Sequence, residues 1–194
     1  MMYKAFVFDF FGVVCSEIAP FWFRKYLPEK AAVEVKDKLV GPADRGEISQ
    51  AELFVRLGEF AGIPPSRVEE EWWTYVSINN EVIKMVKELK NDHKVALLTN
   101  AISDFFREIL TRNNLDGVFD HIVVSSEERV AKPDSLIYMK VLERLSVPAE
   151  EVLMIDDNPA NIQGAKDVGM DGVVFESAEQ LREVLSECGC LTRR

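Results

Sequence analysis

Three acidic residues follow strongly apolar segments of the sequence, at positions where they are able to hold a metal ion. Asp9 comes directly after the run AFVF, and Asp156 and Asp157 come directly after the run EVLMI. Runs of this kind, rich in Val, Ile, Leu or Phe, are typical of buried strands. Carboxylates that converge on one spot repel each other, and a divalent cation removes the repulsion. Because hard oxygen ligands suit Mg²⁺, the three acids predict a magnesium site.

Two further apolar segments are followed by residues that donate hydrogen bonds to an anion. Thr99 and Asn100 follow the run KVALL, and Lys132 lies shortly after the run HIVV. A hydroxyl, an amide and an ammonium group are suitable donors to phosphate oxygens. Ligands of open α/β sheets bind outside the carboxyl ends of the strands, where we expect all of these residues to meet. The set therefore predicts a site for a phosphorylated ligand together with Mg²⁺.

The apolar segments are expected to be parallel strands covered on both faces, because they show little alternation of apolar and polar residues. These strands are expected at 5–10, 94–100, 121–126, 151–157 and 172–177. Amphipathic helical patterns lie between the strands from Glu81 onward, and Asn158 and Ser177 are placed to cap two of these helices. This order predicts an α/β fold with an open, doubly wound parallel sheet.

The stretch from Ser16 to Asn80 interrupts this alternation with helical patterns only. Four helices are expected there, at 20–27, 31–40, 49–62 and 65–77. Ser49 and Glu52 have the spacing of a capping box at the start of the third. Because the insert begins soon after Asp9, we expect it to cover the site as a lid. The chain thus divides into a core of residues 1–15 and 81–194 and a helical cap of residues 16–80.

The order of the polar segments resembles that of the haloacid dehalogenase superfamily, whose larger part is phosphatases. Four motifs of that family are matched along the chain. They are FDFFGVV around Asp9, LLTN with Thr99 and Asn100, AKPD with Lys132, and MIDDNPANIQGAKDVGM with Asp156 and Asp157. The resemblance covers the whole chain and implies a Rossmann-like doubly wound core with a small all-helical cap domain.

This resemblance implies a Mg²⁺-dependent phosphatase that acts on a small phosphorylated metabolite. Asp9 would be the nucleophile and would accept the phosphoryl group as an aspartyl-phosphate. The metal ligands would be Asp9, the backbone carbonyl of Phe11, Asp156 and Asp157. Of the late pair, Asp157 is favoured as the direct ligand. The phosphate oxygens would be bound by Thr99, Asn100 and Lys132, of which Thr99 and Lys132 would also act in catalysis.

Phe11 departs from the pattern of the family. Its phosphatases commonly carry a second Asp two residues after the nucleophile, and this Asp protonates the leaving oxygen. Phe11 keeps a backbone carbonyl but no acid, which predicts slow turnover or a leaving group that needs little protonation, such as that of a sugar 1-phosphate, an acyl phosphate or an aryl phosphate. We therefore expect p-nitrophenyl phosphate to be hydrolysed far faster than glycerol phosphate. An alternative is a phosphate-binding or regulatory protein that keeps the cation site without turnover.

Two other classes of protein share part of the pattern. True haloacid dehalogenases carry an aromatic residue at the position of Phe11, but they use no metal and lack the acid pair of the last motif. Receiver-type signalling domains place an acid pair, a Thr and a Lys around Mg²⁺. Their acid pair comes early in the chain, however, and no helical insert follows their first strand. The phosphatase is therefore favoured over both.

The cap is expected to contribute contacts to the substrate. Arg45, just ahead of a capped helix, is able to reach a substrate carboxylate or phosphate, and a surface ion pair fits its position equally well. Phe21, Trp22 and Phe23, at the entrance of the cap, are expected to line the substrate pocket, with Trp22 as the first choice. Trp72 and Trp73 are expected in the core of the cap.

Composition restricts the partners of the chain. With 23 Lys and Arg against 33 Asp and Glu among 194 residues, the formal net charge is -10. Binding of nucleic acid through a broad basic surface is not expected, because phosphate neutralisation needs clustered Lys and Arg. Neither a signal peptide nor an apolar run long enough to cross a bilayer is recognised. We expect a cytoplasmic monomer or homodimer that acts on a small molecule, without membrane contact.

Overall fold

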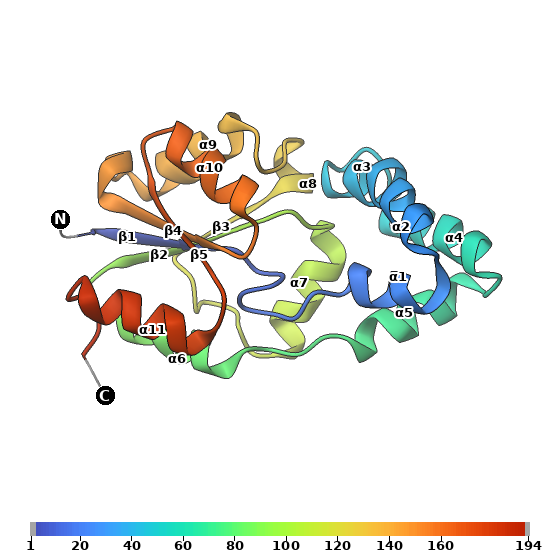
Figure 1. Ribbon diagram of the computed structural model, residues 1–194, viewed down its shortest axis with the longest axis horizontal. Helices are drawn as coiled ribbons and strands as arrows, with labels where there is room; N and C mark the ends of the chain where they lie inside the picture. The colour runs from blue at the N-terminus through green and yellow to red at the C-terminus, as the bar shows by residue number, and fades with distance from the viewer. Residues whose placement is uncertain (1–2, 193–194) are drawn as a thin grey trace.

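A computed structural model describes residues 3–192 and contains a parallel sheet of five strands at its centre (Figure 1). The spatial order of the strands is β3-β2-β1-β4-β5. Their bounds are β1 Ala5–Phe8, β2 Lys94–Thr99, β3 His121–Val124, β4 Val152–Asp156 and β5 Asp171–Val174. All four pairings are parallel. The doubly wound parallel sheet predicted from the apolar runs is confirmed.

Helices cover both faces of the sheet. One face carries α6 (Asn80–Leu89), α7 (Ser103–Arg112) and α11 (Ala178–Glu187), and the other carries α9 (Ser135–Leu145) and α10 (Pro159–Asp167) (Figure 1). The short segments α8 (Ser125–Glu128) and η2 (Ala149–Glu151) lie within the connections. The apolar side of each long helix packs against the sheet, as its amphipathic pattern requires.

Strand β1 lies in the middle of the sheet and is completely buried. Phe6 and Phe8 face one hydrophobic cluster, while Ala5 and Val7 face the other, and all four have no exposed surface. A strand buried on both sides has no polar face to alternate with, which explains its continuous apolar run. Because β2 and β4 flank β1, the residue after β1 emerges between the tips of these two strands.

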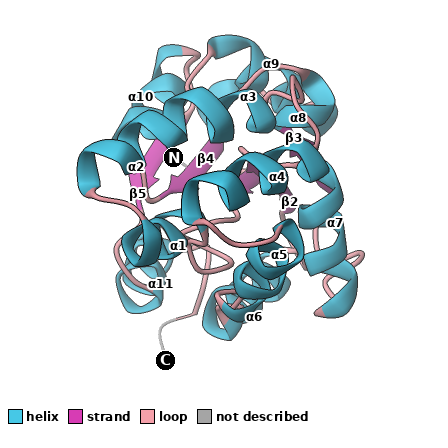
Figure 2. Ribbon diagram, turned by 90° about the vertical axis from the view of Figure 1, so that its right-hand side faces the viewer, coloured by secondary structure: helices cyan, strands magenta, loops and turns pink. Residues whose placement is uncertain are grey.

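The insert after β1 is helical and lies beyond the carboxyl ends of the strands (Figures 1 and 2). Its helices are α1 (Ala19–Tyr26), α2 (Glu29–Val35), a π-helical turn η1 (Lys36–Val40), α3 (Gly41–Asp44), α4 (Gln50–Ala61) and α5 (Pro65–Thr74). Aromatic contacts join this cap to the core, since Phe54 and Trp72 both pack against Phe105 of α7. The exact domain limits, 16 and 80, stay a prediction.

None of the helices in residues 3–192 has the length and apolar character that a membrane span requires.

Candidate active site

The central strand delivers Asp9 to a nearly closed position, where its side chain is fixed by two donors. Asp9 is only 7% exposed. Its Oδ1 accepts a hydrogen bond from the backbone N–H of Phe10 at 2.6 Å and an ion pair from Lys132 Nζ at 2.8 Å. The Asp9 N–H continues the pairing with β4 by donating to the carbonyl of Ile155. Asp9 is therefore held rigidly at the centre of the sheet edge.

The turn after Asp9 requires a glycine at position 12. Gly12 adopts a positive φ of 90°, a conformation that favours glycine. A Cβ at this position would lie 2.4 Å from Oδ2 of Asp157, well inside van der Waals contact. The missing side chain thus lets the carboxylate of Asp157 pack directly against the turn, next to the loop that carries Phe11.

Lys132 connects the nucleophile candidate to the late acid pair. Its Nζ lies 2.8 Å from Asp9 Oδ1 and 2.6 Å from Asp156 Oδ2, and its side chain is completely buried. Burial by itself would lower the pKa of Lys132, but the two carboxylates outweigh it and raise the pKa. Lys132 therefore stays charged between the two acids.

Asp156 and Asp157 have different environments, although they are adjacent in the chain. Asp156 is fully buried and accepts hydrogen bonds from Lys132, from the backbone N–H of Asn158 and from the side-chain amide of Asn161. The carboxylate of Asp157 is half-buried, lines a cavity and has no side-chain partner within the described chain. Asp157 is thus the acid of this pair with oxygens available to a ligand.

The three acids fit a divalent cation. Oxygens of Asp9, Asp156 and Asp157 lie within 4.8 Å of one another. Burial raises the pKa of Asp9 well above its usual range, with Lys132 opposing this shift and Asp156 adding to it. The pKa of Asp157 is also raised, first by burial and then by Asp156. A single lysine does not balance three carboxylates, and a cation with oxygen ligands would complete the neutralisation.

Thr99 and Asn100 lie at the tip of β2 but have different surroundings. Thr99 is fully buried, and its Oγ1 has no hydrogen-bond partner in residues 3–192, as expected of a group that awaits a ligand. It is not one of the residues that line the cavity. The Asn100 amide instead clamps the main chain of Lys132: Oδ1 accepts from its N–H at 2.8 Å, and Nδ2 donates to its carbonyl at 3.0 Å. Asn100 also lines the cavity, and its contact with phosphate stays a prediction.

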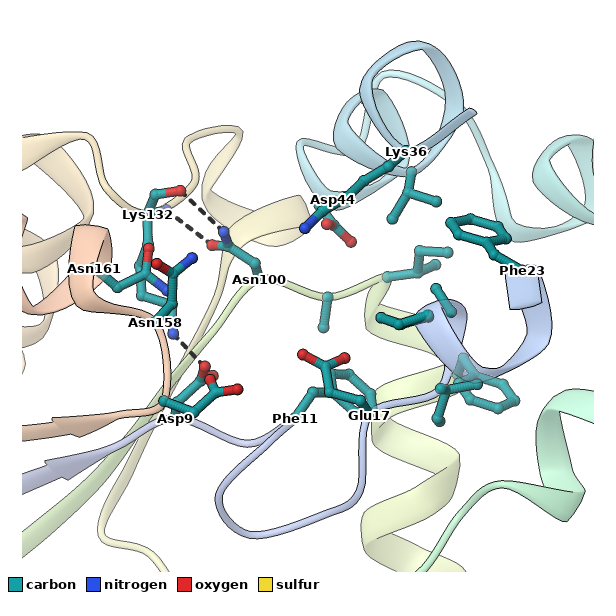
Figure 3. Close-up of a pocket in the computed structure, with 18 of the residues that line it drawn as sticks. Asp9, Phe11, Glu17, Phe23, Lys36, Asp44, Asn100, Lys132, Asn158 and Asn161 are labelled. Carbon is teal, nitrogen blue, oxygen red and sulfur yellow. Dashed lines mark hydrogen bonds and ion pairs between the residues drawn. The ribbon is translucent and has the colours of Figure 1, made fainter. Parts of the chain in front are cut away.

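A cavity of about 430 Å³ opens from this cluster toward the cap (Figure 3). Its core end is polar and includes Asp9, Asn100, Lys132, Asp157, Asn158 and Asn161. Its cap end is mostly apolar and includes Ile18, Pro20, Phe23, Val40, Trp72, Ile102 and Phe105. Figure 3 shows the same change along the cavity, from nitrogen- and oxygen-bearing side chains near Asp9 to carbon-only side chains near Phe23. The cavity therefore suits a ligand with one charged end and one less polar end.

Three of the cap residues expected near the substrate do not line the cavity: Phe21, Trp22 and Arg45. Trp22 has no exposed surface and packs in the cap against Phe23 and Tyr26. Phe23, which was expected in the same role, does line the cavity. Arg45 forms a partly exposed ion pair with Glu47 at 2.6 Å, which is the surface pairing considered for it. Trp72, expected in the cap core, lines the cavity as well as contacting Phe54 and Phe105.

Several site residues carried no recognisable signal in the sequence. The cap and its entry loop bring three charged side chains to the cavity: Glu17, Lys36 and Asp44 (Figure 3). Each is an ordinary acid or lysine within a polar segment, so only the tertiary fold reveals its position. Asn161 had a weak signal, because it lies in the first turn of the helix that follows the acid pair, where its amide donates to Asp156.

Known proteins share the sequence pattern and the fold of this chain. A family model for haloacid dehalogenase-like hydrolases matches residues 3–169. A sesquiterpene phosphatase of Aspergillus oryzae is 26% identical over 152 residues, which cover 76% of this chain and 78% of that protein. A phosphorylated carbohydrates phosphatase of Thermotoga maritima is 33% identical over 93 residues, which cover 48% of this chain and 42% of that protein.

A solved structure has the same fold. A HAD family enzyme from Bacteroides thetaiotaomicron, in complex with magnesium and inorganic phosphate, superposes with a TM-score of 0.76 at 21% identity, covering 92% of this chain and 98% of that chain. At this identity the likeness concerns the fold. The family model, in contrast, spans most of the sequence and every motif discussed above. The chain belongs to the haloacid dehalogenase-like hydrolases.

Proposed function

We propose that the chain is a Mg²⁺-dependent phosphatase that hydrolyses a small phosphorylated metabolite through an aspartyl-phosphate on Asp9. The observation that carries the proposal is the cluster of Asp9, Lys132, Asp156 and Asp157 at the polar end of the cavity. The similarity to two phosphatases, and to an enzyme solved with magnesium and phosphate, supports the same chemistry.

Asp9 is oriented for nucleophilic attack. Its Oδ1 is occupied by Phe10 and Lys132, whereas Oδ2 has no hydrogen bond to the described residues and is free to attack phosphorus. Attack forms an acyl phosphate and breaks the bond to the leaving oxygen. Water then attacks the phosphorus, the bond to Asp9 breaks, and inorganic phosphate is released. A carboxylate suits both steps, because the acyl phosphate that it forms is reactive.

Lys132 and Thr99 would hold the transferring group. Phosphoryl transfer depends on positioning and on charge stabilisation at the phosphoryl oxygens. Lys132 Nζ lies beside the nucleophile and brings a fixed positive charge to these oxygens. The buried Oγ1 of Thr99 lacks a partner, and leaving such a group unpaired costs about 1–3 kcal/mol, which a phosphate oxygen would recover. Asn100 fixes the main chain of Lys132.

The cation would be held by Asp9, Asp156, Asp157 and the backbone carbonyl of Phe11. When bound, Mg²⁺ supplies positive charge that offsets the carboxylates and the phosphoryl oxygens. Asp157 is proposed as the direct ligand of the late pair, because the oxygens of Asp156 already accept several hydrogen bonds. Lys132 fixes Asp9 and Asp156, and Asn161 also fixes Asp156.

The leaving group of the substrate would occupy the cap end of the cavity. A volume of about 430 Å³ is within the range of small-molecule sites. Similarity to a carbohydrate phosphatase supports a sugar phosphate, for which Glu17, Lys36 and Asp44 offer polar contacts. Similarity to a sesquiterpene phosphatase and the apolar wall around Phe23 support the phosphate of an apolar alcohol. Both classes are small phosphate monoesters.

One feature, Phe11, favours a second candidate, a phosphate-binding or regulatory protein without turnover. Phe11 brings no acid to the cavity, and its ring packs against Phe10. A dehalogenase is a weaker candidate, because the three clustered acids have no role in a reaction that uses no cation.

Release of inorganic phosphate from p-nitrophenyl phosphate tests the three candidates. We expect steady turnover that requires Mg²⁺, stops on chelation and is abolished in Asp9→Asn. Stoichiometric phosphate binding without turnover would favour the regulatory protein. Halide release from 2-haloacids in the presence of chelator would favour the dehalogenase. The exposed control Asp104→Asn, on α7, should behave like the wild type.

A further inference from the structure

An alkyl leaving group needs a proton when its bond to phosphorus breaks, and the groups nearest Asp9 are poorly suited to supply it. Phe11 has no exchangeable proton. Lys132 is paired with two carboxylates and is held in the charged form. Asp157 lies among the proposed cation ligands. The proton must come from elsewhere in the cavity, and the cap brings the remaining acids.

Asp44 presents an unpaired carboxylate to the cavity from the cap. It is the last residue of α3 and lines the cavity that begins at Asp9. Figure 3 shows its carboxyl group directed into the cavity from the cap side, across from Asp9. Its side chain has no hydrogen bond or ion pair to the rest of residues 3–192. An unpaired acid in a cleft is a feature of functional sites.

The main chain at Asp44 is fixed to the core beside the phosphate end. The carbonyl of Asp44 accepts a hydrogen bond from Ser125 Oγ, which in turn accepts one from the backbone N–H of Ala101 at 2.9 Å. Ser125 is fully buried at the tip of β3. Two residues further, a Cβ on Gly46 would lie 2.5 Å from the carbonyl oxygen of Ser126, so the two backbones touch. The acid therefore has a fixed place relative to the strand tips.

The charge state of Asp44 suits proton transfer. Burial raises its pKa to about 7, with Glu17 adding to the shift and Lys36, Arg45 and Lys132 opposing it. An acid–base group transfers protons best when its pKa lies near the working pH. A substantial fraction of Asp44 thus carries a proton at neutral pH, as a general acid must.

We propose that Asp44 is the general acid that protonates the leaving oxygen, taking the role for which Phe11 has no group; this inference rests on the proposed phosphatase function. As Asp9 forms its bond to phosphorus, the bond to the leaving oxygen breaks, and that oxygen takes the proton of Asp44. In the second step the Asp44 carboxylate accepts a proton from the attacking water. The bond between phosphorus and Asp9 then breaks, so both carboxyl groups return to their initial states.

Glu17 is the competing acid, because it also lines the cavity. In-line displacement places the leaving oxygen on the side of phosphorus opposite the attacking Asp9. The carboxyl group of Asp44 reaches the cavity from the cap, whereas Glu17 belongs to the loop that leads from β1 into the cap (Figure 3). Burial and the nearby charge of Asp157 also raise the pKa of Glu17, so the variant Glu17→Gln is needed to distinguish the two acids. Asp44 is favoured because its main chain is fixed to the core by Ser125.

Two substrates of similar shape separate proton donation from every other role. p-Nitrophenolate leaves without a proton, whereas the oxygen of benzyl phosphate leaves only with one. General acid catalysis is worth about 10²–10⁴ in rate. We expect Asp44→Asn to lower kcat for benzyl phosphate about 100-fold or more, and kcat for p-nitrophenyl phosphate less than about tenfold. In the wild type, kcat for benzyl phosphate should decline above about pH 7, where Asp44 loses its proton. This decline should be absent in Asp44→Asn.

Three variants complete the test. Asp44→Glu keeps a carboxyl group and should recover part of the activity on benzyl phosphate. This variant also keeps the test possible if Asp44→Asn folds poorly. Asp37→Asn, an exposed acid in the same cap segment, should leave both rates unchanged. Glu17→Gln should lower both rates by similar factors.

The inference is overturned if Asp44→Asn lowers kcat equally for both substrates. It is also overturned if only Glu17→Gln lowers kcat for benzyl phosphate more than kcat for p-nitrophenyl phosphate. Failure of the wild type to hydrolyse p-nitrophenyl phosphate with Mg²⁺ would instead contradict the proposed function, and the inference with it.

Discussion

Replacing Lys132 by Met should destabilise the metal-free protein strongly, because it leaves two buried carboxylates without their shared cation. Lys132 Nζ lies 2.8 Å from Asp9 and 2.6 Å from Asp156, and its side chain is completely buried. Removal of one partner from a buried ion pair costs about 3–5 kcal/mol. For a domain of this size, each kcal/mol lowers Tm by about 2–4 °C, so we expect a decrease of about 6–20 °C.

The loss of stability in Lys132→Met should depend on pH, because the pKa of Asp9 is shifted in the folded protein. The pKa of Asp9 is raised in the folded protein, so the folded state binds more protons than the unfolded state, and stability falls as pH rises through the raised pKa. Without Lys132 the pKa of Asp9 rises further. Urea unfolding should therefore show a smaller loss near about pH 5 than near about pH 8.

A matched control distinguishes this effect from the loss of any lysine in the cavity. Lys36 is exposed, lines the same cavity and has no ion pair in the described part of the chain. Lys36→Met should change the free energy of unfolding by less than about 0.5 kcal/mol. Equal losses in both variants, or no loss in Lys132→Met, would refute the reasoning that Lys132 balances Asp9 and Asp156.

Two further predictions concern the turn and the cap wall. Gly12→Ala should destabilise the protein by about 1–3 kcal/mol, because φ at this position is 90°. It should also weaken Mg²⁺ binding, because the new Cβ would displace Asp157. An unchanged Mg²⁺ affinity in calorimetry would contradict this. In a series of primary alkyl phosphates, each added methylene should raise kcat/KM by up to about fourfold until the cavity is full, because a buried methylene is worth about 0.8 kcal/mol. A flat series would instead indicate that the apolar wall does not contact the leaving group.

The sheet and the polar end of the site were predictable from local sequence. A strand buried on both faces leaves a continuous apolar run, and parallel strands bring their carboxyl ends to one edge, so Asp9, Thr99 and Asp156 could be placed together before any coordinates. Helix caps were also predictable from the sequence, since Ser49 and Asn158 both accept the hydrogen bonds expected at helix starts.

The cap end of the site was not predictable, because it depends on which faces of the short helices turn toward the core. In the run 21–23 the sequence does not distinguish Trp22 from Phe23, and α1 buries the first and turns the second toward the cavity. Asp44 reaches the cavity only because its main chain docks on Ser125, 81 residues away. The side-chain amide of Asn100 pairs with the backbone of Lys132, 32 residues away, and only the tertiary structure reveals this contact.

Titration calorimetry with Mg²⁺ tests most directly the claim that Asp9, Asp156 and Asp157 share one cation. We expect one Mg²⁺ per chain in the wild type and a loss of affinity of at least about tenfold in Asp157→Asn, equivalent to about 1.4 kcal/mol. The exposed control Asp104→Asn should bind like the wild type. No uptake by the wild type, or undiminished uptake by Asp157→Asn, would contradict the account.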